Sequence, residues 1–219
     1  MQVKKLLCER VFGKAFHKYS LLGDKKFFDP FVFPVAKELK DNFEEVQKEI
    51  KDILKNYDNL VVFQDVSPNQ AYIPKDDGWR MFFFKAMGVR FKRNEKVAPK
   101  ITEILSKYKD IQSPWSGILR MHLGAVVPGQ NECTLLVEQE PYHWKEGELV
   151  LFDDTFDHMA INNTDQHRAI LFLDIMRPLP QPWKFFNWVC RWISLCTPYI
   201  VSAYFRHKKW EERFYSRWK

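Results

Sequence analysis

A histidine and an arginine, His158 and Arg168, stand ten positions apart in the chain. Residues 162–165 between them read Asn-Asn-Thr-Asp, a composition that favours turns because these side chains bond their own backbone. We expect an antiparallel hairpin in which the two residues lie opposite each other, with Cβ atoms roughly 5 to 8 Å apart. An imidazole can ligate a metal, and a guanidinium can grip a carboxylate through two hydrogen bonds. The pair therefore predicts a site for a metal-bound carboxylic acid.

Each residue also has a plain structural interpretation. His158 could be a hydrogen-bonded histidine at the start of a strand. Arg168 could be a solvated charge that pairs with Asp165 or Asp157. Neither residue alone is specific for a function.

The elements that must position this pair are expected to be strands. Alternating, β-branched and aromatic residues predict three of them: Leu149 to Phe152, His158 to Ile161, and Ala169 to Ile175. Upstream, Gly117 to Pro128 predicts another strand, in which Arg120 and His122 share one face because side chains alternate. Both side chains can then point at one ligand, although a solvent-facing His122 is the alternative.

Four sequence motifs lie between Trp144 and Pro178: W-x-E-G, F-D-D-T-F-x-H, N-x-T-D-x-x-R and L-D-I-x-R-P. Together with the block Gly117 to Gly124, they resemble the core of the aspartyl/asparaginyl β-hydroxylase family of Fe(II) and 2-oxoglutarate dioxygenases. The resemblance implies one role for each of five residues: His158 binds Fe(II), Arg168 and His122 contact 2-oxoglutarate, Arg120 lies beside the substrate or cosubstrate, and Asp154 lies near the substrate. For Asp154, a β-turn cap is the other interpretation.

The resemblance is nearest to the lipid A acyl-chain hydroxylase branch of this family, since it continues into residues 186–191. It implies a mainly β fold with flanking helices, a jelly-roll-like (cupin-like) double-stranded β-helix with ligands in the mouth of the barrel. The expected activity is hydroxylation of a lipid acyl chain, similar to that of lipid A, at a membrane surface. Hydroxylation of an aspartyl or asparaginyl residue is a further alternative, because a fold does not determine chemistry.

One part of the family pattern is missing. In the family, a strand and loop ending in H-x-G-P or H-x-D-P precede the arginine-histidine block, and that histidine is the first iron ligand. Here the corresponding letters are Ile111-Gln112-Ser113-Pro114, so a strand and loop on the order of 15 residues are absent. Since such oxygenases commonly hold Fe(II) with two histidines and a carboxylate, His158 alone should retain iron poorly.

Three explanations for the missing segment remain open. The chain is a truncated product or an incorrect gene model of an active enzyme; it is a catalytically impaired relative that serves as a ligand-binding or membrane-surface protein; or His122 enters the metal shell.

Positive charge is concentrated at the two ends of the chain, which carries +6 overall. Residues 1–26 contain seven Lys and Arg against two acids, and residues 180–219 contain eight against two. In the C-terminal stretch, aromatic side chains alternate with these cations, which is typical of helices that bind a membrane interface. Trp210, Phe214 and Trp218 could instead form the inner stripe of a helix packed on the domain.

These features predict a cytoplasmic protein, peripheral on the cytoplasmic face of a membrane, with an anionic membrane surface or a lipid substrate as its partner. The best apolar window, Phe186 to Phe205, contains Arg191 and Pro198, so a spanning helix is not expected. Nucleic acid is not an expected partner, because no recognised motif accompanies the charge. The four cysteines have no zinc-binding spacing and are expected to be free thiols in a reducing compartment.

We expect three parts: a basic segment at 1–33, a dioxygenase-like domain at 34–179 with its β core at 79–178, and a basic, aromatic helical tail at 180–219. Pro34 to Tyr57 predicts one amphipathic helix that supports the sheet. The remaining expectations are a helix and two strands: Pro99 to Tyr108, Val61 to Phe63, and Trp79 to Lys85. Asp76 and Asp77 are expected in a turn rather than at a metal.

Overall fold

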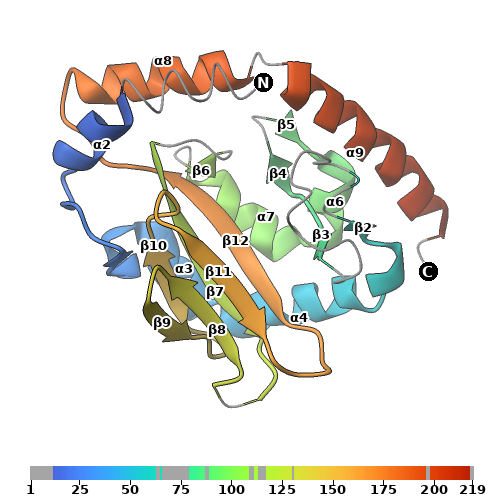
Figure 1. Ribbon diagram of the computed structural model, residues 1–219. Helices are drawn as coiled ribbons and strands as arrows, with labels where there is room; N and C mark the ends of the chain where they lie inside the picture. The colour runs from blue at the N-terminus through green and yellow to red at the C-terminus, as the bar shows by residue number, and fades with distance from the viewer. Residues whose placement is uncertain are drawn as a thin grey trace.

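The computed structural model describes residues 12–62, 65, 79–86, 89–108, 111–112, 117–129, 131–195 and 198–217. Strands in the middle of the fold are flanked by helices, as expected (Figure 1). Helices contribute more residues than strands, however, so the described chain is mixed rather than mainly β. Its strands pair in several antiparallel sheets.

The larger sheet has five strands in the order β1-β10-β7-β12-β6. Their bounds are Phe27–Phe28 for β1, Leu149–Phe152 for β10, Ile118–Val126 for β7, Ala169–Met176 for β12, and Ile111–Gln112 for β6. The strands predicted for β7, β10 and β12 are thus confirmed. β7 lies at the centre, and nearly all of its side chains are buried because both faces of this sheet are covered.

The smaller sheet has three strands, β11 (His158–Asn162), β8 (Cys133–Val137) and β9 (Glu140–His143). Its inner face packs on the larger sheet through an apolar cluster. The fully or largely buried members of that cluster are Cys133, Leu135, Val137, Trp144, Val150 and Phe152. The two sheets therefore enclose a shared core.

The predicted hairpin between His158 and Arg168 is wrong. β11 pairs with β8, with His158 opposite Val137, whereas β12 pairs with β7 and β6. Side-chain bonds from Asn162 to the Gln166 carbonyl and from Thr164 to Asn162 close the intervening loop on itself. After this loop the chain passes from the smaller sheet to the larger one. There the helices that cover the larger sheet also cover the apolar alternate residues of β12, which favours this arrangement.

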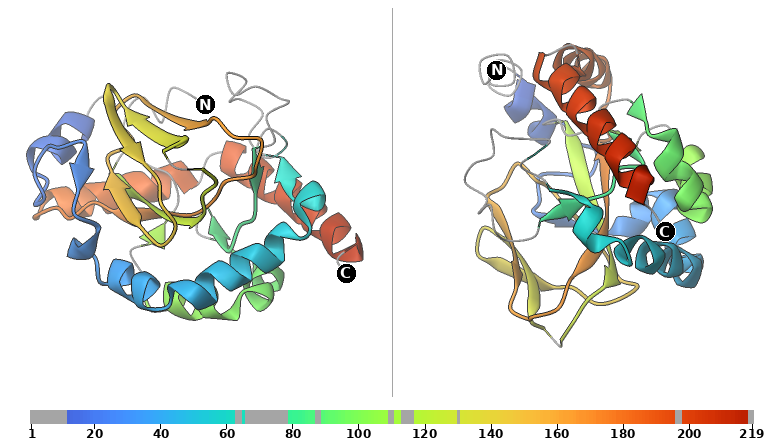
Figure 2. Two further views of the ribbon diagram at one scale, coloured as in Figure 1. Left: turned by 90° about the horizontal axis from the view of Figure 1, so that it is seen from below. Right: turned by 90° about the vertical axis from the view of Figure 1, so that its right-hand side faces the viewer.

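Helices cover the other face of the larger sheet (Figure 2). They are α3 (Pro34–Asp41), α4 (Phe43–Leu54) and α7 (Pro99–Ser106). Their buried residues share one core with the residues of β7 and β12 that face the helices. The single helix predicted from Pro34 to Tyr57 is interrupted at Asn42, whose side-chain amide donates to the Glu38 carbonyl at 2.8 Å. Tyr57 begins a short 3-10 helix, η3 (Tyr57–Asn59). The helix predicted from Pro99 is confirmed.

The remaining elements before β6 are short. They are α2 (Lys14–Lys18), η2 (Pro30–Val32), β2 (Val61–Val62), β3 (Arg80–Met81), β4 (Lys85–Ala86), β5 (Val89–Arg90) and α6 (Lys92–Val97). β2 pairs with β3 and β4 pairs with β5, so the strand predicted over Trp79 to Lys85 is two separate strands. Asp76 and Asp77 lie outside the described residues.

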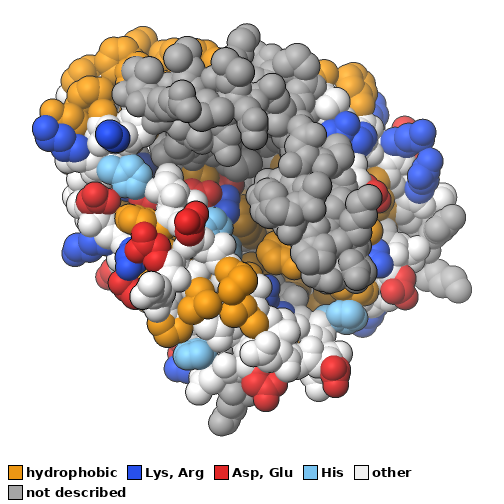
Figure 3. All heavy atoms as spheres, viewed as in Figure 1, with side chains coloured by type: hydrophobic (Ala, Val, Ile, Leu, Met, Phe, Trp, Pro, Cys, Tyr) orange, Lys and Arg blue, Asp and Glu red, His pale blue; other side chains and the backbone are white. Residues whose placement is uncertain are grey.

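Two helices follow β12: α8 (Trp183–Leu195) and α9 (Pro198–Arg217). α9 packs on the domain, because Phe214 joins the main core and the Trp210 indole donates to the Asn59 carbonyl at 2.9 Å. For these two residues the packing interpretation is confirmed and the interfacial one is wrong; Trp218 lies outside the described residues. α8 instead runs along the top of the molecule, where Figure 3 shows hydrophobic side chains at the surface.

Over the described part of the chain, no helix is both long and apolar enough to span a bilayer. Cys133 and Cys190 are buried free thiols, in line with the expectation, while Cys8 and Cys196 fall outside the described residues.

Candidate functional site

His122 lies at the middle of β7, on the face that points away from the helices and towards the smaller sheet. Its neighbours across the larger sheet are Val150 of β10 and Phe172 of β12. The imidazole is also ringed by Trp144 and Phe152, with ring centroids 5.9 and 5.1 Å away, and His122 is only 6% exposed. The sequence alternative of a solvent-facing His122 is therefore wrong.

Neither ring nitrogen of His122 has a hydrogen-bond partner among the described residues. Burial lowers the pKa of this imidazole well below its usual range, and the positive charges of Arg120 and Arg168 lower it further. A neutral imidazole offers one N–H donor and one acceptor. Leaving such a group buried and unpaired costs about 1 to 3 kcal/mol, which a bound ligand would recover. The buried indole N–H of Trp144 lacks a partner as well among those residues.

Arg168 lies directly before β12 and is partly buried. Its guanidinium stacks over the Trp144 ring at 4.3 Å, and Nη1 donates to the Ile161 carbonyl at 3.1 Å. Burial lowers its pKa, but a guanidinium remains charged at neutral pH. Since that group carries five N–H donors and Ile161 takes one, Arg168 can still grip a carboxylate.

Arg120 shares the inward face of β7 with His122. Its Nη2 lies 2.8 Å from an Asp154 carboxylate oxygen, and its Nε donates to Asp174 at 3.1 Å. Burial raises the pKa of Asp174 to about 7, although the positive charge of Arg120 opposes this shift. The contact of 2.8 Å makes Asp154 an ion-pair partner of Arg120 at the same site.

His158 begins β11 and is exposed. Its Nδ1 lies 2.9 Å from the Phe156 carbonyl, which can only accept, so Nδ1 carries the proton of the neutral ring. Nε2 then presents a lone pair, which is how a metal-binding histidine is oriented by a bond from its other nitrogen. This Nε2 is 3.5 Å from Nη1 of Arg120.

The predicted residues thus gather at one place, although not in the predicted way. Instead of facing each other across a hairpin, His158 and Arg168 lie near His122 from the smaller and the larger sheet. The Phe152 ring contacts both His158 and His122, and Arg168 stacks on Trp144, whose ring is 5.9 Å from that of His122. Arg120 and Asp154 complete the group. We call these five residues the candidate site.

All six histidines of the chain lie in the described part, so the possible imidazole ligands can be compared. Away from the candidate site, the other four make contacts of their own: His17 with Thr155, His143 with Thr134, His167 with Tyr57, and His207 with Phe91. Within the described ranges, no three His, Cys, Asp or Glu side chains are grouped to hold a metal. The described residues fit a carboxylate ligand well, but they supply only His158 as an oriented metal ligand.

The sequence reasoning did not identify an ion pair that holds the loop before His158. Asp153 and Arg177 are both fully buried and pair with each other. Asp153 also accepts hydrogen bonds from the backbone N–H and hydroxyl of Thr155, at 3.1 and 2.7 Å. Both residues lie inside the motifs that carried the resemblance, in F-D-D-T-F and R-P, which is the only signal that pointed to them.

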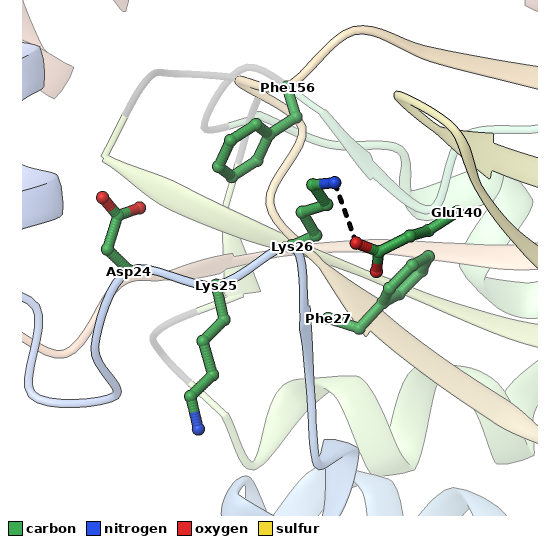
Figure 4. A pocket seen from close by; sticks show the side chains of 6 residues that line it. All are labelled: Asp24, Lys25, Lys26, Phe27, Glu140 and Phe156. Carbon is green, nitrogen blue, oxygen red and sulfur yellow. Dashed lines mark hydrogen bonds and ion pairs between the residues drawn. The ribbon is translucent and has the colours of Figure 1, made fainter.

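A surface pocket lies beside the loop that precedes His158, since Phe156 of this loop lines it (Figure 4). It is lined by Asp24, Lys25, Lys26, Phe27, Glu140 and Phe156, and an ion pair of 2.8 Å joins Lys26 to Glu140 across it. None of the five candidate-site residues lines this pocket, so it does not mark the candidate site.

The sequence profile of the aspartyl/asparaginyl beta-hydroxylase family matches residues 40–114 and 110–178. The chain is 32% identical over 217 residues to the ornithine lipid ester-linked acyl 2-hydroxylase of Rhizobium tropici, an alignment that covers 91% of this chain and 77% of that protein. The chain belongs to the aspartyl/asparaginyl beta-hydroxylase family.

Mammalian relatives match over shorter stretches. The human aspartyl/asparaginyl beta-hydroxylase is 27% identical over 135 residues, which are 49% of this chain and 18% of that protein. The mouse aspartate beta-hydroxylase domain-containing protein 2 is 28% identical over 166 residues, 64% of this chain and 47% of that protein. The chain thus spans less than half the length of these two relatives.

The comparisons also agree with a missing segment. An alignment of 217 residues that covers 91% of a 219-residue chain must contain residues of the Rhizobium tropici protein that have no counterpart here. The family profile matches in two parts that meet at residues 110–114. That is the place, between α7 and β7, where the sequence indicated that a strand and loop are absent.

Proposed function

We propose that this protein is an Fe(II)- and 2-oxoglutarate-dependent hydroxylase that acts on the acyl chain of a membrane lipid. The observation that carries the proposal is His122, a buried imidazole without a partner among the described residues, placed beside two arginines. Such a surrounding suits a ligand with carboxylate groups and an apolar linker. 2-Oxoglutarate has both.

Different residues of the candidate site would bind 2-oxoglutarate and Fe(II). Arg168 would hold one carboxylate with its free N–H groups, since the Trp144 ring and the Ile161 carbonyl fix the orientation of its guanidinium. His122 would contribute one hydrogen bond, and Phe152 and Phe172 would keep water away from it. His158 would hold Fe(II) through Nε2, and the metal with its cosubstrate would supply the oxidising power for hydroxylation.

A lipid substrate is supported by the extent of the resemblance to the Rhizobium tropici protein, whose name states an acyl 2-hydroxylase of an ornithine lipid. That alignment covers far more of this chain than the one with the human aspartyl/asparaginyl beta-hydroxylase. Hydroxylation of an aspartyl or asparaginyl residue is the second choice for the substrate.

One observation favours a different function. The described residues present one oriented imidazole and no group of three metal ligands, and the sequence contains no H-x-G-P or H-x-D-P, the motif that the resemblance leads us to expect. A relative that binds 2-oxoglutarate or lipid without hydroxylating would show the same features. The competing proposal is such a ligand-binding or membrane-surface protein.

Two measurements on the intact chain separate these functions, after the coding region between Ser106 and Pro114 has been verified. The first is calorimetric binding of 2-oxoglutarate without oxygen, with and without Fe(II). The second is succinate release in the presence of a bacterial lipid extract. We expect binding and succinate release. Binding of 2-oxoglutarate without succinate release would favour the ligand-binding protein. If 2-oxoglutarate does not bind, the candidate site serves neither 2-oxoglutarate-dependent hydroxylation nor 2-oxoglutarate binding.

A further inference from the structure

Three aromatic side chains form a continuous strip on the outer face of α8. Phe185, Trp188 and Trp192 are 54%, 49% and 47% exposed, although they are large apolar residues. Their rings contact one another in sequence, with centroids 6.2 Å apart from Phe185 to Trp188 and 6.0 Å apart from Trp188 to Trp192. We call these three residues the aromatic ridge. The helix that carries them runs along the top of Figure 1, and Figure 3 shows hydrophobic side chains at that edge in the same view.

The aromatic ridge is not the face through which α8 packs on the domain, because the opposite face of the helix is buried. Asn187 and Cys190 are 1% and 2% exposed there, and the Asn187 amide donates to the Gly117 carbonyl at 2.8 Å. A water-facing helix normally shows the reverse pattern, with polar residues outside and apolar ones inside. The fold therefore holds a row of aromatic rings at the surface, and such exposed apolar patches commonly mark interaction sites.

The sequence stretch that carries the ridge has charges of one sign. No Asp or Glu occurs from Ile175 to Trp210, whereas five cations flank or follow the ridge in that stretch: Lys184, Arg191, Arg206, Lys208 and Lys209. Lys184 is exposed beside Phe185, and the Arg191 guanidinium lies 5.5 Å from the Trp192 ring. A surface of this sign attracts anions and repels cations.

We propose that the aromatic ridge of α8 docks the protein on an anionic lipid bilayer, with the three rings among the headgroups and the cations against lipid phosphates. Tryptophan flanked by lysine and arginine is the usual composition of a helix that lies in a membrane interface. Each cation near such a surface adds attraction that salt screens, which an apolar protein partner would not require. This proposal rests on the proposed function in that the substrate is a membrane lipid. Docking on a membrane needs neither iron nor turnover, however, so the docking proposal and the proposed hydroxylase activity can be refuted separately.

The test is sedimentation of the full chain with vesicles, without iron or 2-oxoglutarate. Vesicles of phosphatidylglycerol and phosphatidylcholine are compared with phosphatidylcholine alone, at low and high salt. We expect binding to the anionic vesicles that weakens with salt, and a loss on the order of tenfold for each of Trp188→Ala and Trp192→Ala. Circular dichroism and thermal melting of each variant verify that α8 is still folded.

Phe31→Ala is the matched control for Phe185→Ala. Both phenylalanines are 54% exposed, but Phe31 belongs to η2, which packs with α3 and β10. We expect Phe185→Ala to weaken vesicle binding and Phe31→Ala to leave it unchanged. Wild-type chain that stays in solution with anionic vesicles, or equal binding by the Phe185 and Phe31 variants, would overturn the proposal. A dimer that dissociates in the Trp188 variant would overturn it too, by assigning the ridge to a second copy of this chain.

Discussion

The side-chain amide of Asn187 in α8 donates a hydrogen bond of 2.8 Å to the carbonyl of Gly117, the residue directly before β7. The same carbonyl accepts from the backbone N–H of Arg177 at 2.9 Å. The helix that carries the aromatic ridge is thereby fixed to the strand that carries Arg120 and His122. A protein docked through α8 would hold its candidate site at a constant position above the membrane.

This junction predicts a strong effect of Gly117→Ala. A Cβ at residue 117 would lie 1.8 Å from Oδ1 of Asn187, so the helix must shift or the amide must leave. We expect a loss of about 1 to 3 kcal/mol in the free energy of unfolding, measured by urea denaturation. Gly13→Ala is the control, because a Cβ there meets no atom within 4 Å.

The double variant that combines Gly117→Ala with Asn187→Ala tests whether the clash is the cause. Removing the amide makes room for the new methyl group at position 117, so the loss in the double variant should be smaller than the sum of the two single losses by more than about 0.5 kcal/mol. Simple additivity would show that Gly117 matters for another reason, such as its own backbone conformation.

The buried ion pair of Asp153 and Arg177 predicts a second large effect. Asp153→Asn removes the charge that compensates Arg177, which is fully buried, and we expect a loss of about 3 to 5 kcal/mol in the free energy of unfolding. Asp24→Asn is the matched control, since Asp24 pairs with His17 while 60% exposed and should cost less than about 1 kcal/mol. Equal and small losses in the two variants would mean that the pair contributes little to the loop before His158.

Arg168→Lys tests whether the guanidinium of Arg168 binds 2-oxoglutarate. Lysine keeps the charge but loses the planar fork and the stacking on Trp144, so we expect affinity to fall by on the order of 10- to 100-fold in calorimetric titrations. Arg80→Lys is the control, because Arg80 also lies over an aromatic ring, Tyr57 at 5.0 Å, and also donates to backbone carbonyls. A drop of equal size in both variants would indicate a general loss of stability rather than a lost ligand contact.

The sequence predicted the strands well because alternation is a local property. Arg120 and His122 were expected on one face of β7, and the structure has them there. Alternation does not say which strand is the partner, however, and the bonds that close residues 162–166 were not visible in the sequence. The hairpin of His158 and Arg168 was therefore mispredicted, although the structure places both residues near His122.

Features that depend on contacts between residues far apart in the chain could not be predicted from the sequence. The pairing of Asp153 with Arg177 joins residues on either side of β11 and β12, and only burial shows that it is important. Likewise, Trp188 and Trp210 look alike in a basic, aromatic tail. Trp210 is half-buried and its indole donates to the Asn59 carbonyl. Trp188 is exposed, because α8 packs on the domain through its opposite face, which carries Asn187.

His207 predicts how the stability of the protein depends on pH. It lies on the inner face of α9, 1% exposed, with the rings of Phe91 and Trp210 at 4.0 and 4.9 Å, and burial lowers its pKa to about 4. In the unfolded chain a histidine has a pKa near 6.5, so below that pH the unfolded state takes up the proton first. Stability is therefore lost as pH falls from about 6.5 to about 4, by roughly 2 to 3 kcal/mol for this residue alone.

His207→Leu removes this proton uptake while keeping the site apolar. We expect urea denaturation of the variant to show a smaller loss of stability between pH 7 and pH 4.5 than the wild type, by about 2 kcal/mol. Some acid sensitivity should remain, because burial lowers the pKa of His122 in the same direction. His143→Leu is the control, since His143 is exposed on β9. Identical pH profiles for wild type and His207→Leu would show that His207 can be protonated without leaving its place under α9.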